Sequence, residues 1–277
     1  MSDFDLDRWV ARSGALDLSD IDWDAVPASP VPAEAVRVLR YMQDIESHTI
    51  VYVRQLLATR AIDDPEVATF LACWFHEETF HGLALDRFLA AAGCPLGPRP
   101  SARSDVGLVT RLEELAMGLV SRAWPDFVAV HMTWGAINEL TTLTGYRRLS
   151  AIAGHPVLTE LLARIIRDES RHFFFYYKQA ERRLANPRAA RVARFIIERF
   201  WAPVGSGVQP ADELRFLAAT LLGGPEGEAA ARKVDDTIRR LPGMEGLPLL
   251  CAWVERETPG ATPPPMHNHR VLDCKAA

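Results

Sequence analysis

The sequence predicts an all-α protein whose centre is a bundle of four long helices. A Glu precedes a His by three positions twice, in Glu78–His81 and in Glu169–His172. Each pair lies in a run that reads as helix, so its carboxylate and imidazole leave the same face about one turn apart. Each pair also interrupts an apolar stripe that should face a protein core. This geometry suits two ligands of one metal ion, present in two copies.

The stripes around the two pairs are otherwise apolar. At helical spacing they contain Leu71, Trp74, Leu85 and Phe88, and Leu158, Leu162, Ile165 and Tyr176. A single such pair is more often solvated or satisfied within a core than bound to metal. Of the eight histidines, however, only His81 and His172 have a Glu three residues earlier. A buried carboxylate is costly unless a cation compensates it, so two such pairs favour a metal site.

A di-metal helical bundle needs one further Glu from each of two other helices. Glu46 lies 32 residues before Glu78, and Glu139 lies 30 residues before Glu169. Both interrupt apolar stripes, which is the pattern expected for antiparallel neighbours joined by short loops. The stripe of Glu46 contains Leu39, Met42, Ile50 and Val53, and that of Glu139 contains Met132, Ala136, Leu143 and Tyr146. The predicted metal ligands are Glu46, Glu78, His81, Glu139, Glu169 and His172.

The spacing of these residues also predicts the topology. Between Glu78 and Glu139 there are 61 residues, twice the spacing within each pair of helices. We therefore expect two antiparallel pairs joined by one long crossover connection. Asp64-Pro65 and His155-Pro156 supply start signals for the second and fourth helices. The four core helices are expected over residues 33–60, 65–92, 126–149 and 156–186.

The remaining segments are expected to pack on this bundle as accessory pieces. Residues 1–30 are acidic and should wrap the bundle, and a further helix is expected over 107–123 within the crossover. Three weaker helical stretches follow the bundle, at 188–202, 211–222 and 226–240. The Pro-rich tail from Thr258 is expected to be loosely ordered. The prediction is one domain over residues 1–277, with its core at about 33–186 and C-terminal accessory helices at about 188–257.

Composition narrows the function classes. The formal net charge is −5, which gives no support to a nucleic-acid partner. No apolar run approaches the roughly 20 residues of a membrane span, and the acidic N-terminus does not read as a signal peptide. Cys73, Cys94, Cys251 and Cys274 show no CxxC spacing. They are therefore expected to be reduced thiols in a cytoplasmic protein.

Two stretches carry a resemblance to a known family. Residues 77–82 read EETFHG and residues 168–172 read DESRH. They resemble the EENRHG and DExxH motifs of the soluble acyl-carrier-protein desaturases, within the ferritin-like di-iron superfamily. The resemblance covers about residues 33–186. The chain departs from the family in being shorter and in having Thr79-Phe80 where the family has a polar pair.

The resemblance implies a ferritin-like four-helix bundle holding two iron ions that activate O2. Glu78 and Glu169 would bridge the irons, with Glu46 and His81 on one ion and Glu139 and His172 on the other. The same ligand types also accept manganese. The implied reaction oxidises an unactivated C–H bond of an acyl chain on an acyl carrier protein. A ferredoxin-like electron donor and a homodimer are implied as well.

Three further residues are candidates for supporting roles. Glu77 and Asp168 directly precede the ligand glutamates and are candidates to accept the outer N–H of a ligand histidine, which fixes its tautomer. The alternative is an ordinary exposed acid at a helix surface. The resemblance suggests that Thr142, one turn after Glu139, assists proton delivery. Its alternative is a hydrogen bond back to its own helix.

Two features leave the substrate open. Gly135 and Ala136, one turn before Glu139, either make room for a substrate chain or allow close helix packing. A group of arginines either docks an acidic carrier protein or is a solvated helix end. These arginines are Arg182, Arg183, Arg188, Arg191 and Arg194.

Other branches of the superfamily are alternatives. A radical subunit of ribonucleotide reductase would have Tyr one turn after the first ligand His, where this chain has Leu85. An arylamine N-oxygenase would have a third ligand His on the fourth core helix, where His172 is the single His. An oxygenase that hydroxylates or N-oxygenates a small metabolite with the ordinary ligand set is the runner-up. A ferroxidase or iron-storage role would suit a shorter chain, and a metal-free bundle would bury its carboxylates unpaired.

Overall fold

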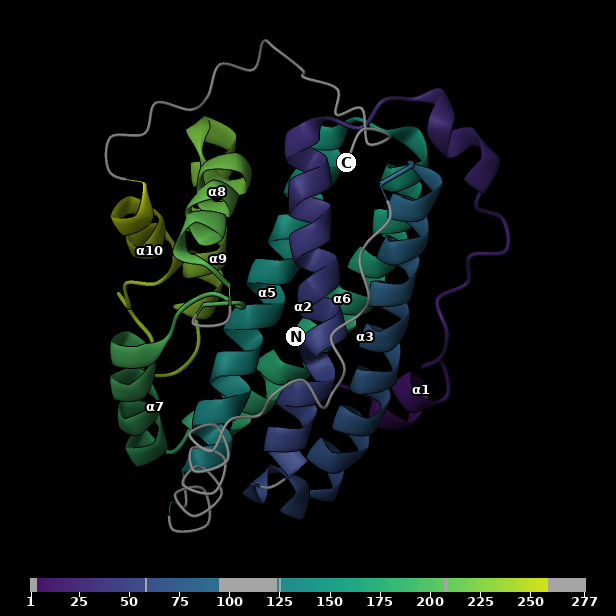
Figure 1. Cartoon of the computed structure of the whole chain (residues 1–277). Coiled ribbons are helices and arrows are strands. Elements are labelled where there is room, and N and C mark those ends of the chain that lie inside the picture. The colour runs from purple at the N-terminus through teal and green to yellow at the C-terminus, as the bar shows by residue number, and fades with distance from the viewer. Residues whose placement is uncertain (1–3, 58, 95–123, 125, 207–208, 259–277) are drawn as a thin grey trace, which may run out of the picture.

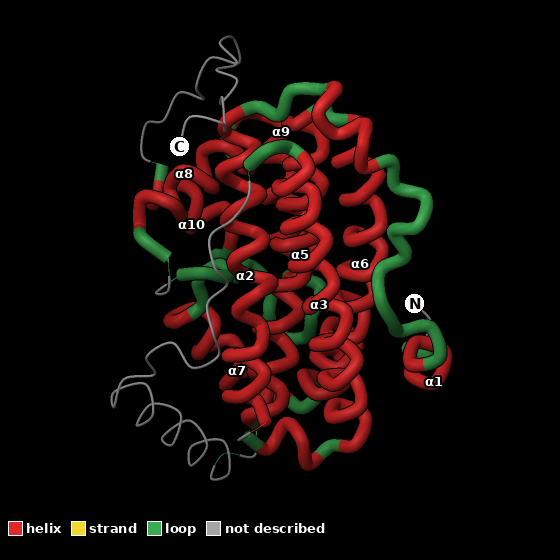
Figure 2. Tube along the Cα trace, turned by 45° about the vertical axis from the view of Figure 1, so that its right-hand side comes forward, coloured by secondary structure: helices red, strands yellow, loops and turns green. Residues whose placement is uncertain are grey.

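The computed structural model of the chain describes residues 4–57, 59–94, 124, 126–206 and 209–258. All regular structure in these residues is helical, apart from isolated β-bridge residues at Pro32 and in the pair Ser206 and Gln209. Figure 2 shows helices joined by loops throughout the described part of the chain. The all-α prediction is confirmed.

Four long helices form the centre of the molecule (Figure 1). They are α2 (Ala33–Leu57), α3 (Pro65–Ala91), α5 (Phe127–Ala153) and α6 (Pro156–Leu184). Helix α2 packs along α3 and α5 packs along α6, while contacts of α2 with α5 and of α3 with α6 join the two pairs. Short connections make each pair antiparallel. The ligand stripes of all four helices therefore face one another.

Local capping explains where these helices begin and end. The Asp64 carboxylate accepts hydrogen bonds from the N–H groups of Glu66 and Val67, and Pro65 occupies the first turn of α3. Helix α5 continues four residues beyond the predicted Leu149, because the first residue to adopt a left-handed conformation is Gly154, with φ 58°. Helix α2 ends before Arg60, where a short 3-10 turn, η2 (Arg60–Asp63), begins.

The N-terminal segment wraps the outside of the bundle, as expected. Helix α1 (Leu6–Val10) contacts α3, and the 3-10 turn η1 (Trp23–Ala28) contacts α3 and α6. Trp9 is buried and stacks on Phe70 with ring centroids 4.8 Å apart. This apolar contact anchors the segment beside the ligand-bearing stretch of α3.

The C-terminal helices form a second layer against α5, seen beside it in Figure 1. They are α7 (Pro187–Phe200), α8 (Ala211–Leu222), α9 (Gly224–Ile238) and α10 (Leu250–Glu257). The first three match the predicted stretches, but α10 was not predicted. Its first N–H groups are held by a side chain of α9, since the Asp235 carboxylate accepts from Leu250 N and Cys251 N. Because this support comes from a residue of another helix, no local sequence pattern indicates helix α10.

One prediction about the cysteines is wrong. Cys73 and Cys251 are free, but Cys94 is disulfide-bonded, and Cys274 lies outside the described residues. Spacing motifs cannot detect a pair that only the fold brings together. The accessory helix expected over 107–123 and the tail after Thr258 also lie outside the described residues. Within the described part, no helix is long and apolar enough to cross a membrane.

Gly135 on α5 offers a test of the bundle's packing. A Cβ atom there would overlap the ring of Tyr176 on α6, which is buried against Trp74 and Phe70. We expect Gly135→Ala to lower the free energy of unfolding by about 1–2 kcal/mol, because overpacking outweighs the better helix propensity of Ala. Denaturant unfolding measures the change. Gly14→Ala is the control, since its Cβ would meet nothing within 4 Å, and equal stabilities of the two variants would contradict the packing.

Candidate metal centre

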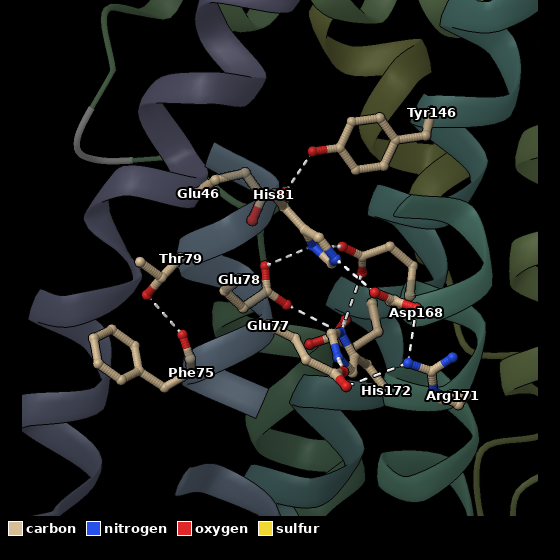
Figure 3. Close-up of polar contacts among 12 residues, drawn as sticks. Glu46, Phe75, Glu77, Glu78, Thr79, His81, Tyr146, Asp168, Arg171 and His172 are labelled. Atoms are coloured by element: carbon tan, nitrogen blue, oxygen red, sulfur yellow. Dashed lines mark hydrogen bonds and ion pairs between the residues drawn. The ribbon is translucent and has the colours of Figure 1, made fainter. Parts of the chain in front are cut away.

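Six acidic and imidazole side chains converge at the centre of the bundle. Figure 3 shows Glu46, Glu78, His81 and His172 pointing toward one another. Each of the four core helices contributes at least one of them, and all six are buried among the apolar residues of the core. They are Glu46 from α2, Glu78 and His81 from α3, Glu139 from α5, and Glu169 and His172 from α6. The structure thus brings together every side chain that the sequence nominated as a metal ligand.

The six side chains form two overlapping groups. Glu46, Glu78, His81 and Glu169 offer ligand atoms that all lie within 4.8 Å of one another. The same is true of Glu78, Glu139, Glu169 and His172. Glu78 and Glu169 belong to both groups. The arrangement can therefore hold two ions that share two carboxylates.

The inward-facing nitrogens of both histidines point at the shared glutamates. His81 Nδ1 lies 3.1 Å from Glu169 Oε1 and 3.5 Å from Glu78 Oε2. His172 Nδ1 lies 3.0 Å from Glu78 Oε1 and 3.7 Å from Glu169 Oε2. Each imidazole therefore faces one carboxylate of its own helix and one carboxylate of the other helix.

Several of these atoms have no hydrogen bond despite being buried. His81 Nδ1, His172 Nδ1 and both carboxylate oxygens of Glu169 lack a partner with acceptable hydrogen-bond geometry. Buried polar atoms are normally satisfied, so four orphaned atoms in one cluster call for a missing partner. Carboxylates and imidazoles are the donors that iron and manganese accept in proteins. The residues therefore fit a pair of such ions, which would complete the coordination of all four atoms.

Burial and mutual contacts shift the pKa values of the cluster in both directions. Burial, reinforced by the charge of Glu78, raises the pKa of Glu46, and burial together with the charge of Glu169 raises that of Glu139. Burial opposes the charged form of Glu78 as well, but hydrogen bonds with Glu46 and both histidines outweigh it and lower its pKa. The cluster thus mixes protonated and ionised carboxyl groups.

The pKa values of His81 and His172 shift in the direction opposite to that expected for an imidazole that is simply buried. Burial alone would lower their pKa values. The neighbouring carboxylates of Asp168, Glu169 and Glu78 raise the pKa of His81 instead. Those of Glu169, Glu77 and Glu78 raise the pKa of His172. Both imidazoles therefore tend to hold a proton that a binding metal ion must displace.

An outer layer of charged groups holds the histidines in place. His172 Nε2 donates to Glu77 at 2.7 Å, and His81 Nε2 donates to Asp168 at 3.3 Å. The pairing crosses between helices, because Glu77 shares α3 with His81 and Asp168 shares α6 with His172. Arg171 bridges the two acids, 3.2 Å from Glu77 and 2.7 Å from Asp168. Glu77 and Asp168 lie where the predicted supporting role requires them, and such contacts fix the tautomer that leaves Nδ1 free for metal.

Tyr146 is a site residue that the sequence reasoning counted only as part of an apolar stripe. It lies two turns after Glu139 on α5, is fully buried, and donates a hydrogen bond from its phenol to Glu46 Oε1 of α2 (Figure 3). The stripe placed Tyr146 on the correct face. No local pattern indicates that its hydroxyl reaches a carboxylate on a different helix.

A cavity of about 310 Å³ opens beside the cluster. Its walls include four of the six candidate ligands, Glu46, Glu78, Glu139 and Glu169. Thr142 also lines it. Thr141 and Thr144 donate back to their own helix, whereas within the described part of the chain Thr142 has no such bond. The Thr142 hydroxyl is therefore free to interact with a molecule in the cavity, as its predicted role requires.

The structure distinguishes between the two alternatives left open for Gly135. The space at Gly135 is filled by the Tyr176 ring, which is the close-packing alternative, although both residues also line the cavity.

Most of the predicted arginine patch is engaged within the chain. Arg182 pairs with Glu66, Arg183 with Asp64, Arg188 with Asp126 and Arg194 with Glu198. These pairings agree better with a helix end that serves the fold than with a free docking surface.

No family model, curated protein or solved structure matches the chain.

Tyr146→Phe tests the link between the phenol and the cluster. Loss of the hydrogen bond frees Glu46 and should weaken metal binding by about 10-fold or more, since supporting hydrogen bonds contribute 10- to 100-fold in metal affinity. Competition with a chelator measures the change. Tyr41→Phe is the matched control, because the Tyr41 hydroxyl donates to Val204 O and touches no candidate ligand. Equal affinities in the two variants would remove Tyr146 from the site.

The raised pKa values of His81 and His172 predict a pH dependence. Metal ligands must be deprotonated, so protons compete with the metal ion as the pH falls. Because both pKa values lie above the ordinary value of about 6.5, competition should begin above that pH. We expect affinity to fall progressively from a pH above about 6.5 downward, with proton release on binding, in calorimetry with two buffers of different ionisation enthalpy. An affinity that stays constant down to about pH 6 would contradict this.

Proposed function

We propose that this chain is a non-haem di-iron oxidoreductase on a ferritin-like bundle, which uses O2 to oxidise an unactivated C–H bond of an aliphatic chain. The observation that carries the proposal is the pair of four-residue groups that share Glu78 and Glu169 and whose four glutamates line a cavity. Metal ions held there would face a space large enough for O2 and part of an organic substrate.

The residues would divide the work of holding two ions between them. Glu78 and Glu169 would be shared by both ions, while Glu46 and His81 would hold one ion and Glu139 and His172 the other. Two iron ions supply what amino-acid side chains lack, namely the reduction of O2 coupled to oxidation of a C–H bond. Manganese fits the same donors, so the metal is identified by analysis of the purified protein.

The overall reaction needs electrons from outside the chain. For a desaturation, the substrate loses two hydrogen atoms, O2 accepts these with two further electrons and two protons, and two water molecules form. We propose a ferredoxin-like one-electron carrier protein as the reductant. The Thr142 hydroxyl, free in the cavity, is placed to hold or pass a proton there.

The cavity walls support an aliphatic substrate that also carries a polar group. Trp74, Tyr52 and Tyr176 form aromatic walls that exclude water, while His48, Thr49 and Asn138 supply polar groups. An acyl chain delivered by an acyl carrier protein is the first candidate. The polar wall supports a second candidate, a small metabolite that is hydroxylated or N-oxygenated.

Single-turnover oxidation tests the proposal. The protein is loaded with ferrous iron, mixed with O2 alone or with stearoyl or palmitoyl carrier protein, and followed by absorption. Products are then analysed by mass spectrometry. Loss of two hydrogens from the acyl chain is the expected result, and an oxidation transient indifferent to both carriers would favour the small-metabolite candidate.

The control for this experiment is Glu78→Ala, which removes a carboxylate shared by both metal groups. Elemental analysis should show that this variant loses bound iron, and the absorption transient should disappear with it. Stoichiometric iron retained in Glu78→Ala would contradict the assignment of the site.

A further inference from the structure

A second, apolar cavity adjoins the one at the metal centre. It measures about 90 Å³ and lies between α2 and α5 of the bundle and helices α8 and α10 of the C-terminal layer. On the C-terminal side its walls are Leu214, Leu217, Ala218, Leu221, Leu222, Leu250 and Trp253. We call this space the C-terminal chamber. Its lining is mainly apolar, and its polar residues are Tyr41, Glu46, Thr141, Thr142 and Tyr146.

The chamber and the metal-centre cavity share a wall. Ile45, Glu46, Thr142 and Val204 line both spaces. Glu46 is a candidate metal ligand, and Thr142 is the residue with a free hydroxyl. An apolar group in the chamber would therefore lie next to the space in front of the cluster.

Polar contacts hold the chamber's walls in position. Arg37 of α2 makes a two-pronged ion pair with Glu213 of α8, with its closest contact at 2.8 Å. Arg148 of α5 donates to the carbonyl oxygen of Leu221 at 3.0 Å. Helix α8 is thus tied to both bundle helices across the chamber. Paired Arg–carboxylate contacts of this kind fix geometry as well as adding stability.

Glycines keep the chamber and its shared wall open. Gly145 of α5 lines the chamber, where a Cβ atom would come within 3.0 Å of Met42 Cε. Gly205 follows Val204 with φ +89°, a conformation that favours glycine, and a Cβ there would overlap the Tyr41 hydroxyl. The wall at Val204 therefore depends on a residue without a side chain.

The size of the chamber limits what enters it. Its 90 Å³ exceeds the roughly 30 Å³ that one water molecule occupies and is smaller than an engineered cavity of about 150 Å³ that binds benzene. The leucine-rich part of its wall offers no hydrogen bond to a polar group, so burial there favours an apolar one. The end of an unbranched aliphatic chain, about three or four carbons long, fits both the volume and the chemistry.

We propose that the C-terminal chamber receives the apolar end of the substrate, so that α8 sets the chain length on the far side of the reacting carbon. The polar end then lies in the metal-centre cavity near His48 and Asn138. This inference rests on the proposed function, since it assigns a substrate class to the same site. It also gives the C-terminal layer a role in specificity.

The test is a chain-length series of binding measurements that does not depend on turnover. Straight-chain primary alcohols of about 6 to 12 carbons are titrated into the full-length protein by calorimetry, with its metal content measured in parallel. Affinity should rise by about fourfold per methylene group and then level off when the chamber is filled. Affinities that do not depend on chain length, or no binding at all, would overturn the proposal.

Two variants should shift the levelling-off point in opposite directions. Ala218→Leu fills the chamber and should shorten the best chain by about two or three carbons, whereas Leu221→Ala enlarges it and should lengthen the best chain. Ala219→Leu is the matched control, because the same change is made one position along α8 at a residue that does not line the chamber. A merely structural effect would weaken all chain lengths alike, and this result in both variants would overturn the proposal.

The outcome is separable from that of the proposed function. If the protein binds alcohols with the expected dependence on chain length but holds no metal, the chamber stands and the di-iron proposal fails. If it binds iron stoichiometrically but the variants do not move the chain-length preference, the chamber proposal fails alone.

Discussion

Four carboxylates and two imidazoles are buried together in a largely apolar core. The contacts around them offset the free energy that this burial costs. Charged groups of this kind are strongly disfavoured inside a protein unless they are paired. Here protons and mutual hydrogen bonds satisfy part of the cluster, which is why the pKa values of Glu46 and Glu139 are raised while that of Glu78 is lowered. The orphaned atoms of Glu169 and the two histidines mark the part that metal ions would satisfy.

The surrounding architecture keeps this cluster rigid. Each candidate ligand histidine is held by an acid from the opposite helix, and Arg171 joins the two acids. In addition, the Tyr146 hydroxyl donates a hydrogen bond to Glu46. These contacts link α2, α3, α5 and α6, so that a shift of one helix would disturb ligands on another. Positioning of this kind is what a metal centre requires, because coordination geometry tolerates little displacement.

The C-terminal layer changes the character of the site. A bundle of four helices alone would leave the outer face of α2 and α5 open beside Glu46. Helices α8 and α10 cover that face with leucine side chains and leave the C-terminal chamber enclosed between the layers. The polar ties from Arg37 and Arg148 show that the layer is fixed to the bundle at this place. The layer therefore belongs to the same structural unit as the metal centre.

The all-α class and the convergence of six side chains were predictable from local regularities. Helical spacing places residues three or four apart on one face. The similar separations of Glu46 from Glu78 and of Glu139 from Glu169 place these residues at matching heights in neighbouring antiparallel helices. Asp64-Pro65 and His155-Pro156 marked helix starts through local capping, which the structure bears out.

What only the tertiary structure decided involves contacts between distant segments. The hydrogen bond of Tyr146 to Glu46, the crossing of Glu77 and Asp168 to the opposite histidines, and the bridge through Arg171 all depend on how two helices rotate and pack. The disulfide of Cys94, the support of α10 by Asp235 and the C-terminal chamber depend in the same way on chain segments meeting in space. Periodicity fixes the face of a helix on which a side chain lies, because that follows from covalent geometry. It does not fix the partner across the interface, because that follows from the packing of the whole core.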